Sequence, residues 1–173
     1  MRRAVTDVFG HPVVRRCQLH KLRNVTDRLP DAVASTVAKR MRRTYHHPDP
    51  LIAQAELEAL ARELDRSHPG AANSLREGLA ETLTIGRLGV PPTLARTLRS
   101  TNTIESMISI CRDHAGNVKC WRDGQMALRW VAAGMSEAAT QFRRVSGYLH
   151  LPALRVALDA TISDVTPTKE DAA

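Results

Sequence analysis

The sequence predicts a mostly α-helical chain, and three observations support this fold class. Apolar residues recur three or four positions apart through most of residues 18–88, which is the spacing of one helix face. Prolines and glycines divide this region into segments of helix length. A single run, residues 13–17, has the β-branched composition of a strand. Because a lone strand leaves backbone groups unpaired, we expect its partner strands to lie upstream of Met1.

The first expected elements are a helix end and the strand. Residues 2–9 form the helix end, which stops at Gly10. The strand follows over 13–17, and apolar residues at helical spacing then predict a helix over 19–29.

Three further helices follow, separated by turns that contain proline. Pro30 ends the preceding helix, and Asp31 is placed to start the next one. The three helices are expected over 31–46, 51–66 and 71–86.

The last third of the chain contains two helices on either side of an irregular basic loop. The helices are expected over 102–113 and 122–142, with the loop over 115–119. A short helix follows near 152–160, and the small, polar residues 161–173 predict a flexible tail.

Positive charge is concentrated in two segments. The net charge is +7 and the isoelectric point is near 10.0. Residues 1–43 contain 11 Lys or Arg against 3 Asp or Glu, and residues 87–155 contain 10 against 4, whereas residues 44–86 contain 3 against 7. Basic segments attract a phosphate backbone. Charge alone leaves nucleic-acid binding and an ordinary solvated surface equally open.

Other protein classes are disfavoured by simple counts. No apolar run approaches the roughly 20 residues that span a bilayer, and the arginines near the start are not followed by the apolar region of a signal peptide. Three cysteines without an export signal argue against a disulfide framework. We therefore expect a cytoplasmic protein with no membrane partner.

Two short segments carry more information than composition. Residues 16–25 contain Cys-x-x-His at the point where the strand meets a basic helix, and residues 98–106 contain Asn-Thr-Ile-Glu-Ser at the start of another helix. Together they resemble the Mutator family of insertion-sequence transposases, in which these two motifs occur in this order with a helical stretch between them. The similarity continues through 112–121 and 126–148, so it covers nearly the whole chain.

The resemblance implies a fold and a domain organisation. Family members have an RNase-H-like α/β catalytic domain that is interrupted by an all-helical insertion. Residues 1–27 would then be the end of the RNase-H-like core and residues 28–95 the insertion. Residues 96–160 would hold the catalytic Glu helix and the C-terminal helices, ahead of the tail over 161–173.

The resemblance makes Glu105 the catalytic glutamate. In the family, two Asp and this Glu hold Mg²⁺ or Mn²⁺ for DNA strand cleavage and transfer. Hard divalent cations of this kind need clustered carboxylates. Asp7 is the one acid before Cys17, and the two catalytic Asp are expected upstream of Met1. The chain would then carry one of three catalytic acids, and we expect a truncated, inactive piece.

Glu105 also has a structural interpretation. Asn102 can act as a helix N-cap with Glu105 reaching back to it, which is the pattern of a capping box. Helical periodicity places Glu105 on one face with Ser109 and Arg112. The buried stripe of this helix is expected at Ile104, Met107, Ile108 and Cys111.

The Cys-x-x-His motif has three readings. The resemblance places Cys17 and His20 near the active site, together with Arg23, Asn24 and Asn102. Cys17 and His20 could also bind zinc with a second Cys-x-x-His pair, Cys111 and His114. Alternatively, Cys17 is a small buried residue at a strand end.

Basic residues that flank the two motifs could contact DNA phosphates. Trp121 could stack on an exposed base, or it could fill the core. The DNA-binding candidates are Lys21, Arg99, Arg112, Lys119, Trp121 and Arg122.

The function implied by the resemblance is DNA transposition. The expected partners are the element's terminal repeats and its target DNA, bound by a homo-oligomer in the bacterial nucleoid, with no small-molecule substrate. The main alternative is a non-catalytic helical module that binds DNA or protein without a metal. A third possibility is a poorly folded remnant with no activity.

Overall fold

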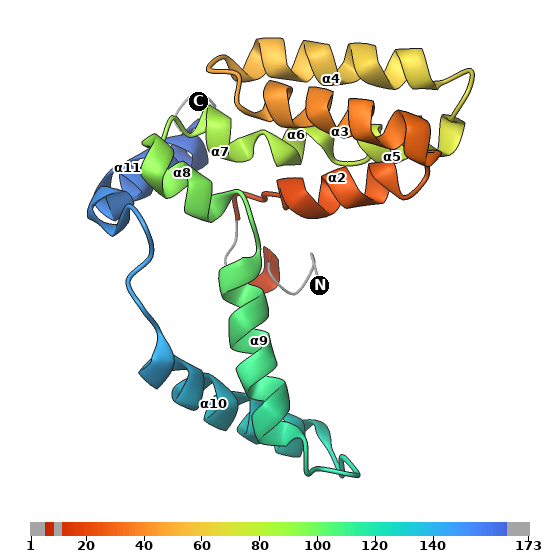
Figure 1. The fold of residues 1–173 in the computed structure, drawn as a ribbon. Coiled ribbons are helices and arrows are strands. Elements are labelled where there is room, and N and C mark those ends of the chain that lie inside the picture. The colour runs from red at the N-terminus through yellow and green to blue at the C-terminus, as the bar shows by residue number, and fades with distance from the viewer. Residues whose placement is uncertain (1–5, 9–11, 166–173) are drawn as a thin grey trace, which may run out of the picture. The chain divides into compact units, whose positions relative to one another are not determined.

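The computed structural model describes residues 6–8 and 12–165, and Figure 1 shows how these residues are arranged. The described residues are mostly helical and include no strand, which confirms the mostly α prediction. Thr6–Val8 are helical, and the rest of the expected first helix lies largely outside the described residues. The last helix runs to Val165, so the expectation that the flexible tail begins at residue 161 was wrong. Residues 166–173 lie outside the described residues.

The elements labelled in Figure 1 have the following bounds: α2 (Gln18–Thr26), α3 (Asp31–Tyr45), α4 (Pro50–Leu64), α5 (Pro69–Arg76), α6 (Leu79–Thr82), α7 (Thr84–Arg87), α8 (Pro92–Leu98), α9 (Asn102–Ala115), α10 (Gly124–Gln141), the 3₁₀ turn η1 (Tyr148–His150) and α11 (Leu151–Val165). The chain divides into two compact units, residues 1–99 with 147–173, and residues 100–146.

The first unit is built on a ring of four helices. α2 packs against α3 and α5, and α4 packs against the same two helices. Each helix sends one large, fully buried side chain into the shared core, namely Val25, Met41, Leu57 and Leu75. Burying a side chain of this size contributes about 1.5–3 kcal/mol. Leu22 and Val25 of α2 belong to the same hydrophobic core as residues of α3, α4 and α5. Helix α2 therefore packs together with the helices that follow it.

Local sequence signals explain where these helices start. Asp49 is the N-cap of α4, and its carboxylate accepts a hydrogen bond from the Leu51 backbone N–H at 2.8 Å. Pro50 and Pro69 occupy the first positions of α4 and α5, where no N–H is needed. Pro30 precedes α3 as expected.

The single helix expected over 71–86 is instead three short helices, α5, α6 and α7. The first break lies at Gly78, whose φ of +61° is in the left-handed region that favours glycine. The flexible side chain of Arg16 packs against the place that a Cβ atom on Gly78 would occupy.

The segment 13–17 is extended, as expected, and pairs with no strand among the described residues. Because its partner strands were expected upstream of Met1, the strand stays a prediction. Its backbone groups bond instead to the α6–α7 region. The Arg16 N–H donates to the Glu81 carbonyl at 2.9 Å, and the Thr84 hydroxyl donates to the Val14 carbonyl at 2.8 Å. Helical segments therefore satisfy two of the backbone groups of this extended run.

The start of α2 meets the end of α8. The backbone N–H of Gln18, the first residue of α2, donates to the carbonyl of Arg99, the C-cap of α8, at 3.1 Å. Helix α8 was not expected from the sequence. Pro92 occupies the first helical position, where proline is favoured.

The second unit is a helical pair, α9 and α10. The helices approach closely at Gly134, where an added Cβ would lie 2.8 Å from Cys111 Cα. Gly134 and Ala138 are the buried residues that the structure describes in these two helices. The buried stripe expected on α9 was therefore wrong: Ile104 is 48% exposed and Ile108 is 38% exposed. The physical reason is that one neighbouring helix covers only part of an amphipathic face.

Large apolar side chains remain exposed along this helical pair. The exposed residues are Ile104, Ile108, Trp121, Leu128, Val131, Met135 and Phe142. None of the helices within residues 6–8 and 12–165 is long and apolar enough to cross a membrane.

Candidate active site and nucleic-acid surface

Glu105 lies in the first turn of α9, and its side chain is exposed. The Thr101 hydroxyl donates a hydrogen bond to Glu105 Oε1 at 2.5 Å. A carboxylate at this position is favoured by the positive end of the helix dipole. The arrangement holds an anionic oxygen pair at a helix N-terminus, where it can act as a ligand or as a hydrogen-bond acceptor.

The expected cap on this helix was wrong in one detail. The N-cap is Thr101, and Asn102 is the first helical residue. The Thr101 side chain makes no cap hydrogen bond to the backbone, and its hydroxyl donates to Glu105 instead, so the expected capping box centred on Asn102 is not the arrangement found. Thr101 was missed because three consecutive residues, Ser100 to Asn102, all belong to types that cap helices.

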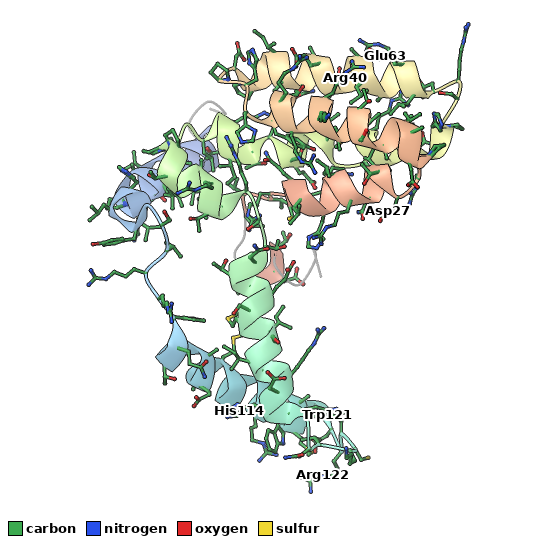
Figure 2. All side chains as sticks on the ribbon, viewed as in Figure 1. Asp27, Arg40, Glu63, His114, Trp121 and Arg122 are labelled. Carbon is green, nitrogen blue, oxygen red and sulfur yellow. The ribbon has the colours of Figure 1, made fainter. Side chains whose placement is uncertain are left out.

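Arg112 lies two turns after Glu105 on α9, and its side chain is exposed, as is Ser109. The connection from α9 to α10 holds Lys119, Trp121 and Arg122, all exposed. Trp121 is 46% exposed, so it does not fill a core within the described residues. Figure 2 shows Trp121 and Arg122 at the end of the hairpin where α9 passes into α10. Arg122 Nε lies 3.4 Å from Asp123 Oδ2, which leaves most of the guanidinium to solvent.

The Cys-x-x-His motif spans the start of α2. Cys17 is the N-cap residue and is buried, whereas His20 is half-buried. Both line an open pocket of about 350 Å³ on the first unit. The residues that line it are Arg15, Arg16, Cys17, His20, Lys21 and Asn24. Burial lowers the pKa of the Arg15 guanidinium from its usual value.

Lys21 is placed inside the first unit. Its side chain is 4% exposed, and its ammonium donates to the Ser74 and Glu77 carbonyls at 2.5 Å each. These carbonyls belong to the C-terminal end of α5, where a cation is favoured. Burial lowers the pKa of Lys21. Lys21 therefore holds α2 against α5, and the prediction that it contacts DNA does not fit this position.

The remaining predicted residues differ in exposure. Arg23 and Asn24 are exposed on α2, and the Asn24 carbonyl accepts a hydrogen bond from the Ser74 hydroxyl at 3.3 Å. Arg99 is half-buried, and its Nε is buried without a hydrogen-bond partner among the described residues. Asp7 is exposed.

Metal-binding side chains do not gather in the described part of the chain. No group of three or more His, Cys, Asp or Glu residues that could hold a metal occurs there. Cys17 and His20 belong to the first unit, whereas Cys111 and His114 belong to the second. The cysteines form no disulfide.

Comparison with known proteins decides the family. The family model described as "Transposase, Mutator family" matches residues 1–145. The chain belongs to the Mutator family of transposases. The match includes both motifs, from Cys17 to Glu105, and the basic connection that follows α9.

A curated relative of this Mutator-family chain is the transposase for insertion sequence element ISRM5 of Rhizobium meliloti (strain 1021). The two are 27% identical over 152 residues. The alignment covers 88% of this chain and 38% of the relative, so the chain spans well under half the relative's length. No solved structure matches the chain.

Proposed function

We propose that this chain is part of an insertion-sequence transposase and that Glu105 supplies one carboxylate to its catalytic centre. The observation that carries the proposal is the exposed position of Glu105 in the first turn of α9, within the region that the family model matches. A buried carboxylate would be less available to a metal. The Thr101 hydroxyl orients the carboxylate without neutralising its charge.

Mg²⁺ or Mn²⁺ is the cofactor that the family implies. The described residues do not fit a two-metal centre by themselves, because they contain no cluster of three candidate ligands. Glu105 can supply one ligand, and we propose that other segments of a longer protein supply the rest. The relative's greater length is consistent with such segments.

The exposed apolar surface of the α9–α10 pair supports the same proposal. Ile104 and Leu128 are 48% and 61% exposed, and several neighbouring apolar residues are similarly exposed. Large apolar side chains exposed together on two packed helices commonly mark an interaction site. We propose that an RNase-H-like α/β core, supplied by the rest of the protein, covers it.

DNA is the proposed partner. The exposed residues Arg112, Lys119 and Arg122 on α9 and its connection to α10 can contact phosphates, and Trp121 beside them can stack on an unpaired base. The proposal includes the element's terminal repeats and its target as substrates, a homo-oligomeric assembly, and an association with the bacterial nucleoid.

The test is a strand-transfer assay with a full-length transposase that contains this segment. Glu105→Gln keeps the side-chain shape but removes the anionic ligand, so strand transfer should fall at least a hundredfold while DNA binding stays within about twofold. Asp113→Asn is the matched control, since Asp113 is an exposed carboxylate on the same helix. The control variant should retain normal strand transfer. Normal strand transfer by the Glu105→Gln variant would overturn the proposal.

A non-catalytic helical module is the second candidate function. It is favoured by one observation, the lack of a metal-ligand cluster among residues 6–8 and 12–165. Under this alternative, Glu105→Gln and Asp113→Asn have the same small effect in the assay above, and DNA binding is unchanged in both.

A further inference from the structure

Helix α3 forms one corner of the four-helix ring, because it packs against α2 and α4. The face toward the core carries Val37, Met41 and Tyr45, which are all 5% exposed or less. In a helix with 3.6 residues per turn, the opposite face is left to solvent.

Three cations lie on that outward face. Lys39, Arg42 and Arg43 are exposed and are spaced three and four residues apart, so their side chains lie side by side. None of the three makes a side-chain hydrogen bond or an ion pair with a described residue. By contrast, the Arg40 guanidinium donates two hydrogen bonds to the Glu63 carboxylate on α4. Both residues are labelled in Figure 2. Among the described residues, Arg40 is thus neutralised by an acidic partner and its three basic neighbours are not.

The neighbouring helix has the opposite charge. α3 carries four basic residues and one acidic residue, whereas α4 carries three acidic residues and one basic residue. A uniformly charged surface would only keep the protein soluble. A positive helix face beside a negative one can bind an anionic partner in a defined place.

The chemistry of this face points to phosphates and not to bases. It contains no aromatic side chain, since Tyr45 is on the core side and 5% exposed. Stacking on unpaired bases requires such a side chain or an arginine laid flat on a base. Residues 39–43 rise about 6 Å along the helix axis, which corresponds to about two nucleotides of one strand of a duplex. Ser35 and Thr36, exposed one turn earlier, can add hydroxyl contacts.

We propose that Lys39, Arg42 and Arg43 bind the phosphate backbone of duplex DNA, independently of its sequence. This inference rests on DNA being the partner in the proposed function. It adds a contact surface on the helical ring, separate from the basic residues that flank the two motifs.

The experiment compares two pairs of arginine substitutions in the 173-residue chain. Arg42→Gln with Arg43→Gln removes two charges from α3, and Arg62→Gln with Arg66→Gln removes two exposed charges from the α4 side of the same ring. Net charge changes equally in both variants. Circular dichroism and thermal unfolding establish that both remain folded.

Affinity for a 30-base-pair duplex of arbitrary sequence is measured by fluorescence anisotropy over a series of KCl concentrations. The α3 variant should bind about tenfold or more weakly at low salt, and the slope of log affinity against log salt should fall by about 1.8, the value for two phosphate contacts. The control should change affinity less than about twofold. Equal effects of the two variants, or an unchanged α3 variant, would overturn the inference.

Two further arms distinguish other partners and the underlying function. Phosphatidylserine vesicles and polyglutamate are titrated in the same way. If the α3 variant loses affinity for either of these but keeps its affinity for the duplex, the DNA assignment is wrong. If the unmodified chain does not bind the duplex at any salt concentration, the DNA partner of the proposed function fails as well. Normal duplex binding by the α3 variant overturns only the present inference.

Discussion

Arg16 is joined to Glu81 through both its main chain and its side chain. The Arg16 N–H donates to the Glu81 carbonyl at 2.9 Å, and Arg16 Nε lies 2.7 Å from Glu81 Oε2. Arg16 Nη1 also lies 2.9 Å from Glu77 Oε1. These contacts fix the extended segment before α2 against the junction of α5 and α6.

Glu81→Gln should lower the free energy of unfolding by about 1 kcal/mol. The pair is partly exposed, at 39% for the Arg16 side chain and 22% for that of Glu81, so screening reduces its contribution. Urea denaturation measures the change. Asp27→Asn, an exposed carboxylate on the same unit, is the control and should have almost no effect. Equal losses in the two variants would contradict the role given to Glu81.

Lys21→Met should be more damaging, with a loss of about 2–3 kcal/mol. The methionine fits the buried volume but leaves the Ser74 and Glu77 carbonyls without their donor, and such unsatisfied groups are costly. Lys39→Met on the exposed face of α3 makes the same chemical change and should cost less than about 0.5 kcal/mol. The difference between the two denaturation midpoints is the measurement. A Lys21 variant as stable as the Lys39 variant would show that the buried ammonium contributes nothing.

The first unit should lose stability in acid. The pKa values of three carboxyls are lowered, mainly by hydrogen bonds from arginine: Glu63 by Arg40, Asp65 by Arg76 and Glu77 by Arg16. A carboxyl whose pKa is lower in the folded state stabilises the fold above its unfolded pKa, and this contribution is lost as the pH falls through the folded pKa. The melting temperature should therefore decline below pH 4.5 to 3.8, the usual values for these groups. Arg76→Gln should make the decline shallower, and an identical pH profile in that variant would argue against the linkage.

The sequence predicts helices well where the information is local. α3 and α4 begin and end within two residues of their expected bounds, because Pro30, Asp49 and Pro50 act on the backbone next to them. The break at Gly78 also has a local signal, since glycine favours the left-handed conformation found there, but the helical periodicity of residues 71–86 hid it. The hydrogen bonds from the extended segment before α2 to Glu81 and Thr84 are non-local, and periodicity does not report such contacts.

The candidate site shows the same division. The motif containing Glu105 correctly predicts a helix start, which is a local property. The burial of Lys21 and the exposure of Ile104 depend on which helices pack together, and neither follows from periodicity alone. The basic face formed by Lys39, Arg42 and Arg43 can be predicted from the sequence, because helical periodicity places these residues away from the apolar Val37 and Met41.

Gly134→Leu should disrupt the α9–α10 pair. A Cβ at this position would lie 2.8 Å from Cys111 Cα, so a side chain must push the helices apart. Gly124→Leu is the control, because nothing lies within 4 Å of a Cβ at that position. Limited proteolysis should cut residues 100–146 several times faster in the Gly134 variant than in the control. Equal rates would show that the close approach does not hold the pair together.

The isolated 173-residue chain should show no nuclease or strand-transfer activity in Mg²⁺ or Mn²⁺. Glu105 belongs to no cluster of three candidate ligands among residues 6–8 and 12–165, and a single carboxylate holds these ions poorly. A labelled duplex carrying element ends is the substrate for the assay. Cleavage that disappears in the Glu105→Gln variant would contradict the prediction and would implicate another acid, such as Asp7.

The hydrogen bond between the Gln18 N–H and the Arg99 carbonyl places the two ends of an 80-residue segment next to each other. A segment with adjacent ends can be accommodated within a connection of a host domain without moving the host's two sides apart. The length and surface of such a segment can then vary without a change in the positions of the residues on either side of it. The segment from α2 to α8 has this geometry, because its first and last residues are joined by a backbone hydrogen bond.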